Sequence, residues 1–161
     1  MSESCMGTIA GITRFLDMLA EYKLKDLYCR DSKALLQTLG FFVLGDGAYR
    51  ICVVHPSAPG VVFKVGYGRY STEEMSKSEY KFYHLKATST DKEYLAFPYY
   101  HGKYTSVMEY VESTEKTPYG VCETLEKKLA RCNEFGDFHT GNVIIRHGKP
   151  VIVDYADNDA A

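Results

Sequence analysis

The 161-residue chain is poor in the features that mark membrane and secreted proteins. Its longest apolar runs, such as residues 39–45 and 151–153, fall far short of the roughly 18 to 20 residues that cross a bilayer. Residues 1–11 contain an acid, Glu3, and no basic flank, so they do not read as a secretory signal. These absences predict a cytoplasmic protein that has no membrane partner.

The chain also lacks an excess of charge of one sign and any C-x-x-C pair. Its formal net charge is -2, with acids and bases interleaved, so direct nucleic-acid binding is not expected. The five cysteines are odd in number, which predicts free thiols in a reducing compartment. With 45% hydrophobic and 25% charged residues, the chain is predicted to form one domain around an ordinary core.

Hydrophobic spacing predicts the order of the elements. Residues 3–22 have a helical period, and Ser32 can cap a second helix that ends at Gly40. A change in texture then predicts strands at 41–44, 51–54, 61–65, 94–100 and 104–111. The remaining elements are a helix at 73–86 between the third and fourth strands, a helix at 118–132, and a hairpin of 143–146 with 150–155.

The strongest chemical signal lies in residues 136–154, which read GDFHTGNVIIRHGKPVIVD. Asp137 precedes Asn142 by five residues, and a strand-turn-strand unit then leads to Asp154. Phosphoryl transfer needs a carboxylate to accept the hydroxyl proton and hard oxygen ligands for Mg²⁺. Each residue alone could be a turn former, but together the three match a kinase catalytic loop and metal-binding Asp. The pattern therefore predicts Asp137 as the base, with Asn142 and Asp154 as Mg²⁺ ligands.

The N-terminal half contains a candidate phosphate-binding lysine. Lys64 follows Val62 and Phe63 in the third predicted strand. Such a lysine needs an acid from the next helix to hold it. Glu79 is the preferred partner because the spacing of its helix turns it inward. Glu73 and Glu74 are rivals, which we expect to be solvated caps of the same helix.

A glycine-containing turn separates the first two predicted strands, in the segment LGDGAYRIC. Gly45 and Gly47 let the backbone approach phosphates, and Tyr49 is placed to cover them. The third glycine of a kinase loop is absent, because Arg50 occupies its position. The alternative reading of this segment is an ordinary hairpin turn.

Residues 107–111, VMEYV, have the pattern of a kinase hinge. The backbone of Glu109 and Val111 would pair with the edge of adenine, and Met108 would guard the back of the pocket. A plain buried strand explains the segment equally well when it is taken alone.

Together these motifs resemble the eukaryotic-type protein kinase superfamily over about residues 40–156. The segments LGDGAYR, HPSAPGVVFKVG and FGDFHTGNVIIRHGKPVIVDY resemble more closely the early protein kinases of the T-seven group of coliphages. The resemblance implies an α+β protein-kinase-like fold, with a five-stranded antiparallel N-lobe sheet and one helix over a strongly truncated helical C-lobe. It also implies ATP and Mg²⁺ as cofactors and phosphorylation of serine or threonine in host bacterial proteins. RNA polymerase and RNA-processing enzymes are the implied partners.

Two features of the C-terminal part depart from the pattern of the family. His139 stands where protein kinases of eukaryotes usually carry lysine, and small-molecule kinases have a similar histidine. Seven residues follow Asp154, which leaves no room in this sequence for an activation segment. We therefore expect a single minimal domain made of N-terminal helices (1–40), an N-lobe (41–111) and a truncated C-lobe (112–161).

The N-terminal helices have no counterpart in a usual kinase N-lobe. They are expected to pack against the truncated C-lobe and replace missing core. Ile12, Phe15 and Leu19 lie on one face of the first helix, which alternatively forms a docking surface or the interface of a homodimer.

The preferred function is thus an ATP-dependent serine/threonine protein kinase that modifies host proteins. A second hypothesis is a kinase-fold binding module that inhibits a host protein without phosphorylating it. The truncated substrate platform favours this reading, and the intact set of Lys64, Asp137, Asn142 and Asp154 opposes it. A third hypothesis is a small-molecule phosphotransferase, which His139 favours.

Overall fold

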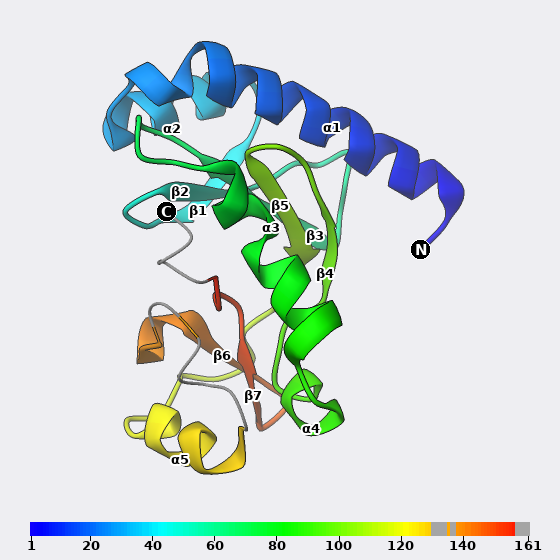
Figure 1. Cartoon of the computed structure of the whole chain (residues 1–161), viewed down its shortest axis with the longest axis vertical. Helices are drawn as coiled ribbons and strands as arrows, with labels where there is room; N and C mark the ends of the chain where they lie inside the picture. The colour runs from blue at the N-terminus through cyan, green and yellow to red at the C-terminus, as the bar shows by residue number, and fades with distance from the viewer. Residues whose placement is uncertain (130–134, 136–137, 157–161) are drawn as a thin grey trace.

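The structure is a computed structural model that describes residues 1–129, 135 and 138–156 (Figure 1). The helices are α1 (Glu3–Tyr22), η1 (Leu24–Asp26), α2 (Cys29–Thr38), α3 (Glu73–Lys81), the π-helical η2 (Phe82–Lys86), α4 (Ser89–Lys92), α5 (Val121–Lys128) and η4 (Thr140–Asn142). The strands are β1 (Phe42–Asp46), β2 (Arg50–Val54), β3 (Val61–Gly66), β4 (Pro98–His101), β5 (Thr105–Glu109), β6 (Val143–Arg146) and β7 (Lys149–Ile152).

Strands β1 to β5 form one antiparallel sheet, in the order β1-β2-β3-β5-β4. Strands β6 and β7 form a separate hairpin, closed by a turn in which His147 and Gly148 both have positive φ. This is the turn geometry that suits a two-residue hairpin. The predicted α+β class with a five-stranded antiparallel sheet is confirmed.

Helix α1 lies along one face of the sheet (Figure 1). Ile9, Leu16 and Ala20 recur at helical spacing and are buried in one cluster with β-strand residues that include Phe63 and Val107. The expectation that the N-terminal helices pack against the truncated C-lobe is therefore wrong for α1. The apolar stripe of this helix covers the sheet face that points away from the hairpin, because β3 is buried on both faces and needs a cover on each.

Polar contacts also hold α1 against the sheet. The carboxylate of Asp17 accepts hydrogen bonds from the backbone N–H groups of Lys103 (2.8 Å) and Tyr104 (2.9 Å) in the β4–β5 turn. Gly102, in the same turn, lies so close to Asp17 and Thr13 that a Cβ at this position would collide with both side chains. The turn therefore fits against the helix only with glycine at this position.

The opposite face of the sheet shares a second apolar cluster with the C-terminal part. Val62 and Met108 of the sheet, Phe82 of η2, Leu125 of α5 and Ile152 of β7 all belong to this cluster. The two clusters divide the side chains of β3 by alternation, as expected for a strand whose neighbours point to opposite faces.

The segment before β4 joins the sheet to the C-terminal hairpin. The Ala96 N–H donates to the Ile152 carbonyl (2.9 Å), and the Ile152 N–H donates to the Tyr94 carbonyl (2.7 Å). The predicted strand over 94–100 is therefore wrong in its first half, since the sheet strand begins only at Pro98. The backbone groups of residues 94–96 are satisfied by β7 instead.

Other element boundaries also differ from the prediction. Helix α2 begins at Cys29, and Ser32 is buried within it and not at its N-cap, although the end near Gly40 is confirmed by its φ of 93°. Helix α5 begins after Gly120, whose φ of 84° cannot continue a helix from 118. Strand β7 ends at Ile152, three residues earlier than expected. No helix within the described ranges is long and apolar enough to cross a membrane.

The packing of α1 predicts a specific loss of stability. Leu16 is fully buried between helix and sheet, so Leu16→Ala should lower the free energy of unfolding by about 2–5 kcal/mol. Met18 on the same helix is 62% exposed, so Met18→Ala should change it by less than about 0.5 kcal/mol. Urea unfolding followed by circular dichroism measures both. Equal effects of the two substitutions would mean that α1 does not pack on the sheet as described.

Candidate active site

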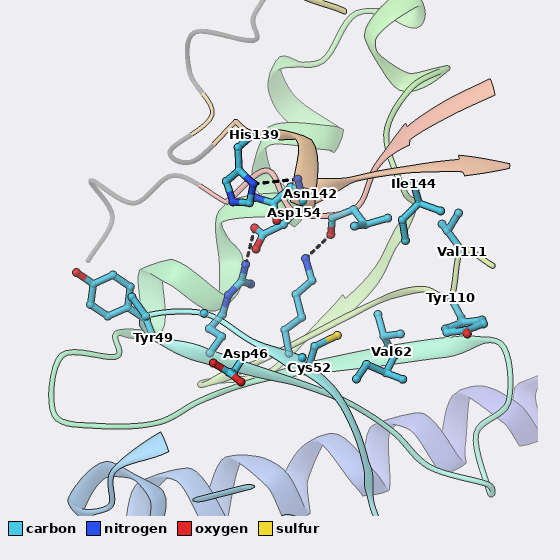
Figure 2. A pocket seen from close by; sticks show the side chains of 18 of the residues that line it. Asp46, Tyr49, Cys52, Val62, Tyr110, Val111, His139, Asn142, Ile144 and Asp154 are labelled. Atoms are coloured by element: carbon cyan, nitrogen blue, oxygen red, sulfur yellow. Dashed lines mark hydrogen bonds and ion pairs between the residues drawn. The ribbon is translucent and has the colours of Figure 1, made fainter. Parts of the chain in front are cut away.

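A cleft of about 450 Å³ lies between the sheet and the β6–β7 hairpin. In Figure 2 the apolar side chains of Val62, Val111 and Ile144 gather at one end, and Asn142 and Asp154 lie at the other. The volume is typical of small-ligand pockets, which combine an apolar wall with a few convergent polar groups. The division into an apolar and a polar end suits a ligand that has a flat ring at one end and charge at the other.

Strand register brings the charged residues of the sheet to one face. Lys64 lies opposite Cys52 on β2 and opposite Ser106 on β5, so these three side chains share the cleft face. Arg50 is two residues from Cys52 and therefore points the same way, and its cross-strand partner is Gly66, which has no side chain. Two cations thus enter the cleft from adjacent strands.

Lys64 is held by Glu79 of α3. Its Nζ donates to Glu79 Oε2 at 2.7 Å, and both side chains are buried. The rival acids lie at the surface, where Glu73 is 3.6 Å from Lys103 and Glu74 is 3.1 Å from Lys81. The structure therefore brings Glu79 to the lysine and leaves Glu73 and Glu74 among solvent-facing charges.

The Glu79 carboxylate has further partners. Its Oε2 also accepts a hydrogen bond from the Tyr155 N–H (3.1 Å), just after the hairpin. Its Oε1 is 2.8 Å from Nη1 of Arg50. Glu79 itself is 0% exposed, so these donors replace water around a buried anion. Lys64 in turn donates to the Val153 carbonyl (2.5 Å), which ties the sheet to the hairpin.

Arg50 bridges two acids across the cleft. While Nη1 contacts Glu79, Nη2 lies 3.0 Å from Asp154 Oδ1. Burial by itself would lower the pKa of the guanidinium, but Glu79 and Asp154 outweigh burial and raise the pKa, so Arg50 stays charged. Figure 2 shows the ion pair with Asp154 as a dashed line.

Asp154 is ionised at neutral pH. Burial raises the pKa of its carboxyl, but the nearby charges of Lys64 and Arg50 more than offset that effect and hold the pKa below its usual range. Its side chain keeps 42% exposure and faces the cleft. It is therefore an accessible anionic oxygen ligand that already has one cationic partner.

The turn between β1 and β2 closes one side of the cleft. The Gly47 N–H donates to the Arg50 carbonyl (2.9 Å), and the Tyr67 hydroxyl donates to the Gly47 carbonyl (2.6 Å). Gly45, Gly47 and Tyr49 all line the cleft. A Cβ on Gly45 would meet no atom within 4 Å, so the missing side chains leave room beside the backbone.

The segment after β5 forms the apolar end. Val111 lines the cleft, whereas Met108 is 1% exposed and lies in the core behind it, outside the lining. The Glu109 side chain turns elsewhere, accepting from the Phe97 N–H (3.0 Å) and pairing with Arg146 (3.2 Å). Glu109 also lines the cleft, but its side chain is engaged in these two contacts.

The loop before β6 supplies the polar end. His139 Nδ1 accepts from the Gly141 N–H (3.0 Å), which shapes the loop, and the Val153 N–H donates to the Asn142 carbonyl (2.9 Å). Asn142 and Asp154 lie next to each other in Figure 2. The predicted base, Asp137, lies outside the described residues.

The central role of Arg50 is not evident from the sequence, where the residue stands out only because it replaces a glycine of the kinase loop. The available signal was strand alternation, because Arg50 and Cys52 must share a face in a strand that pairs with the strand of Lys64. The contributions of the Val153 carbonyl and the Tyr155 N–H could not be found this way, because backbone groups leave no mark in a sequence.

The arrangement of the site has two features in common with protein kinases. A lysine on the third strand, paired with a glutamate on the following helix, is the ion pair that positions phosphates in protein kinases. Asp154 follows the hairpin and Asn142 precedes it, an order that resembles that of the metal-binding Asp and Asn of protein kinases.

Comparisons with known proteins give matches to solved structures at low sequence identity. No protein-family model and no curated protein matches the sequence. A solved streptomycin-ATP-APH(2")-IIa ternary complex is 12% identical, with 82% of this chain and 72% of that chain covered at a TM-score of 0.44. The Rio2 kinase-ADP/Mg²⁺-phosphoaspartate complex from Chaetomium thermophilum is 16% identical, with 90% and 61% covered, also at 0.44. This chain thus spans less than two thirds of the Rio2 chain.

The burial of the Glu79 carboxylate leads to a second prediction about stability. Glu79→Gln leaves Lys64 and Arg50 buried without their shared anion, so the free energy of unfolding should fall by about 3–5 kcal/mol. Glu74→Gln on the same helix removes only an exposed pair and should cost about 1 kcal/mol or less. Chemical denaturation at pH 7 compares the two variants. A Glu79→Gln variant as stable as Glu74→Gln would show that the buried network does not hold the site together.

Proposed function

We propose that this protein is an ATP-dependent phosphotransferase that uses Mg²⁺ and phosphorylates serine or threonine hydroxyls of proteins. The observation that carries the proposal is the buried Lys64–Glu79 ion pair, which lies beside Asp154 in a cleft of nucleotide size. A structural ion pair would serve stability equally well in any core. Its placement at the polar end of a cleft that also has a glycine turn and an apolar wall favours phosphate binding.

The cleft fits a nucleotide by shape and chemistry. Val62, Val111 and Ile144 form an apolar slot for a purine ring, and the turn at Gly45 and Gly47 leaves its backbone open to phosphates. Lys64 is the cation on the adjacent strand that would neutralise phosphate oxygens. These residues account for binding and orientation, which supply most of the catalysis in phosphoryl transfer.

The donor set at the polar end fits a hard divalent cation. Asp154 offers carboxylate oxygens and Asn142 a side-chain amide oxygen, the ligand types that Mg²⁺ prefers. When bound, the ion would neutralise charge on the phosphates. Within the described residues, no group of three or more His, Cys, Asp or Glu side chains could hold a metal. Mg²⁺ in nucleotide sites is commonly held by one or two carboxylates together with substrate phosphates, which this donor set would fit.

The transfer step assigns the remaining role to Asp137. The hydroxyl oxygen of the acceptor would form a bond to the γ-phosphorus as the bond to the bridging oxygen breaks and ADP leaves. Asp137 would orient this hydroxyl and take its proton. This role comes from the D-x-x-x-x-N spacing to Asn142, since Asp137 lies outside the described residues.

The acceptor class rests on the sequence resemblance. The shared segments favour host bacterial proteins as substrates, with RNA polymerase or RNA-processing enzymes as the targets, and a role in host takeover or shut-off. His139 favours the competing class of small-molecule acceptors. A single assay with labelled ATP and bacterial lysate separates labelled proteins from labelled small molecules.

A binding module without catalysis is the second candidate, and one observation favours it. Arg50 already engages Asp154, so a cation held by protein occupies one oxygen of the proposed metal ligand. A protein that kept the fold to grip a host partner would tolerate such a contact.

Nucleotide binding is the first functional prediction. Mg-ATP at millimolar concentration should raise the melting temperature of the protein, because a ligand that binds only the folded state stabilises it. Lys64→Met should lower the apparent affinity for Mg-ATP, obtained from the dependence of the shift on ligand concentration, at least about tenfold. The variant loses a charged contact to phosphate, and a tenfold loss corresponds to about 1.4 kcal/mol. Lys25→Met is the control, because Lys25 is exposed and does not line the cleft. The absence of any shift in the wild type would exclude the proposed function.

Phosphate transfer is the second functional prediction. Asp137→Asn should abolish labelling of bacterial proteins by ATP and keep the thermal shift with Mg-ATP, because it removes the base and no metal ligand. Asp154→Asn should weaken both. Expression of wild type and Asp137→Asn in bacteria then compares growth with the phosphoprotein pattern. Equal toxicity with no new phosphoproteins would identify the binding module as the correct reading.

A further inference from the structure

The polar end of the cleft contains a cation supplied by the protein itself. Arg50 donates from two separate nitrogens, Nη1 to Glu79 (2.8 Å) and Nη2 to Asp154 (3.0 Å). Its side chain is only 10% exposed, so the guanidinium is packed in place and not a mobile surface charge. A planar fork of donors is the group best suited to join two carboxylates in this way.

The sequence position of Arg50 makes this contact specific. It stands at the end of the glycine-containing turn, and its partner across the sheet is Gly66. Ser71 fills the space beside Gly66, where a Cβ would collide with it. The Arg50 side chain therefore has no cross-strand side chain as a neighbour at this position and reaches α3 and the segment after β7.

We propose that Arg50 is a built-in competitor of the divalent cation, which occupies Asp154 in the metal-free protein and sets how much Mg²⁺ the site requires. The inference rests on the proposed function only in taking Asp154 as a metal ligand. Any cation that binds Oδ1 of Asp154 must share that oxygen with the guanidinium or displace it, and two like charges at one oxygen repel each other. Binding of the metal at Oδ1 is thus coupled to release of the Arg50–Asp154 pair.

The Arg50 guanidinium stays in position after it releases Asp154. Glu79 still holds Nη1, and Ser106 Oγ lies 3.4 Å from the same nitrogen. Only Nη2 becomes available, and it then faces the polar end of the cleft, where phosphates are expected. Arg50 would in this way compete with the metal in the free protein and bind phosphate in the complex. This exchange needs a rotation of the Arg50 side chain.

Mg²⁺ binding in the absence of nucleotide tests the competition. Titration calorimetry with MgCl₂ at constant ionic strength should show weak binding to the wild-type chain. Arg50→Gln should bind Mg²⁺ at least about tenfold more tightly, because Asp154 then has no competing cation at Oδ1. Arg30→Gln, at an exposed arginine of α2, is the matched control and should behave as wild type.

The double variant Arg50→Gln/Asp154→Asn identifies the ligand. It should lose the gain in Mg²⁺ affinity, since the oxygen that Arg50 releases is then no longer anionic. Unchanged Mg²⁺ affinity in folded Arg50→Gln, or a gain that persists in the double variant, overturns the proposal. If Arg50→Gln does not fold, Arg50→Lys decides, because one ammonium cannot bridge both acids from separate nitrogens. It should tighten Mg²⁺ binding by at least about threefold, and no tightening overturns the proposal.

The same variants separate this proposal from the proposed function. Tighter Mg²⁺ binding in Arg50→Gln without any binding of ATP would support the competition and refute the phosphotransferase. Normal binding of Mg-ATP together with an unaltered response to Mg²⁺ would support the phosphotransferase and refute the competition. A protein in which no variant binds Mg²⁺ without nucleotide refutes the competition, and the thermal shift with Mg-ATP then decides the phosphotransferase separately.

Discussion

The structure depends on one buried anion, the carboxylate of Glu79. A carboxylate that no water reaches costs several kcal/mol unless cations and hydrogen-bond donors replace its solvent. Here Lys64 and Arg50 arrive from two strands of the sheet, and the Tyr155 N–H arrives from the segment after the hairpin. Three elements that are distant in sequence must therefore meet α3 at one point. The arrangement of the site is a consequence of satisfying this group.

The hairpin would otherwise be weakly attached, because a two-stranded unit alone is marginally stable in water. Strand β7 forms backbone hydrogen bonds with residues 94–96, and the Tyr155 hydroxyl donates to the Ala96 carbonyl (2.7 Å). The same segment continues into β4. The polar end of the cleft is consequently built on a hairpin that is joined to the sheet both through its backbone and through Glu79.

Charge balance explains why a bound polyphosphate would need a counterion in this site. Lys64 and Arg50 together match Glu79 and Asp154, so the four side chains sum to zero. A polyphosphate entering a neutral site finds no excess positive charge and must bring a counterion or displace an internal pair. The weaker of these pairs is Arg50–Asp154, since Asp154 is 42% exposed and its contact is the longer one. An enzyme and a metal-independent binder built on this fold would differ at this contact first.

Local pattern in the sequence was sufficient for much of the fold. Strands β2 and β3, the apolar stripe of α1 and the β6–β7 hairpin are properties of short segments, and all of them appear where they were expected. Boundaries failed where distant residues decided them. Residues 94–96 have the hydrophobic pattern of a strand, but their backbone groups form hydrogen bonds with β7 and not within the sheet. Helix α5 begins later than expected because Gly120 has a positive φ.

For the site, the sequence by itself determined which residue types were available: a lysine on the third strand, acids on the next helix, and an Asn and an Asp around the last hairpin. Only the tertiary structure decided how they combine. Glu73, Glu74 and Glu79 are three glutamates of one helix, α3. The orientation of this helix on the sheet buries Glu79 and leaves the other two at the surface. Arg50 reaches Asp154 across 104 positions of sequence, a contact that no local pattern encodes. The physical reason is that periodicity sets the face on which a side chain lies, whereas its partners depend on which elements the buried charge draws together.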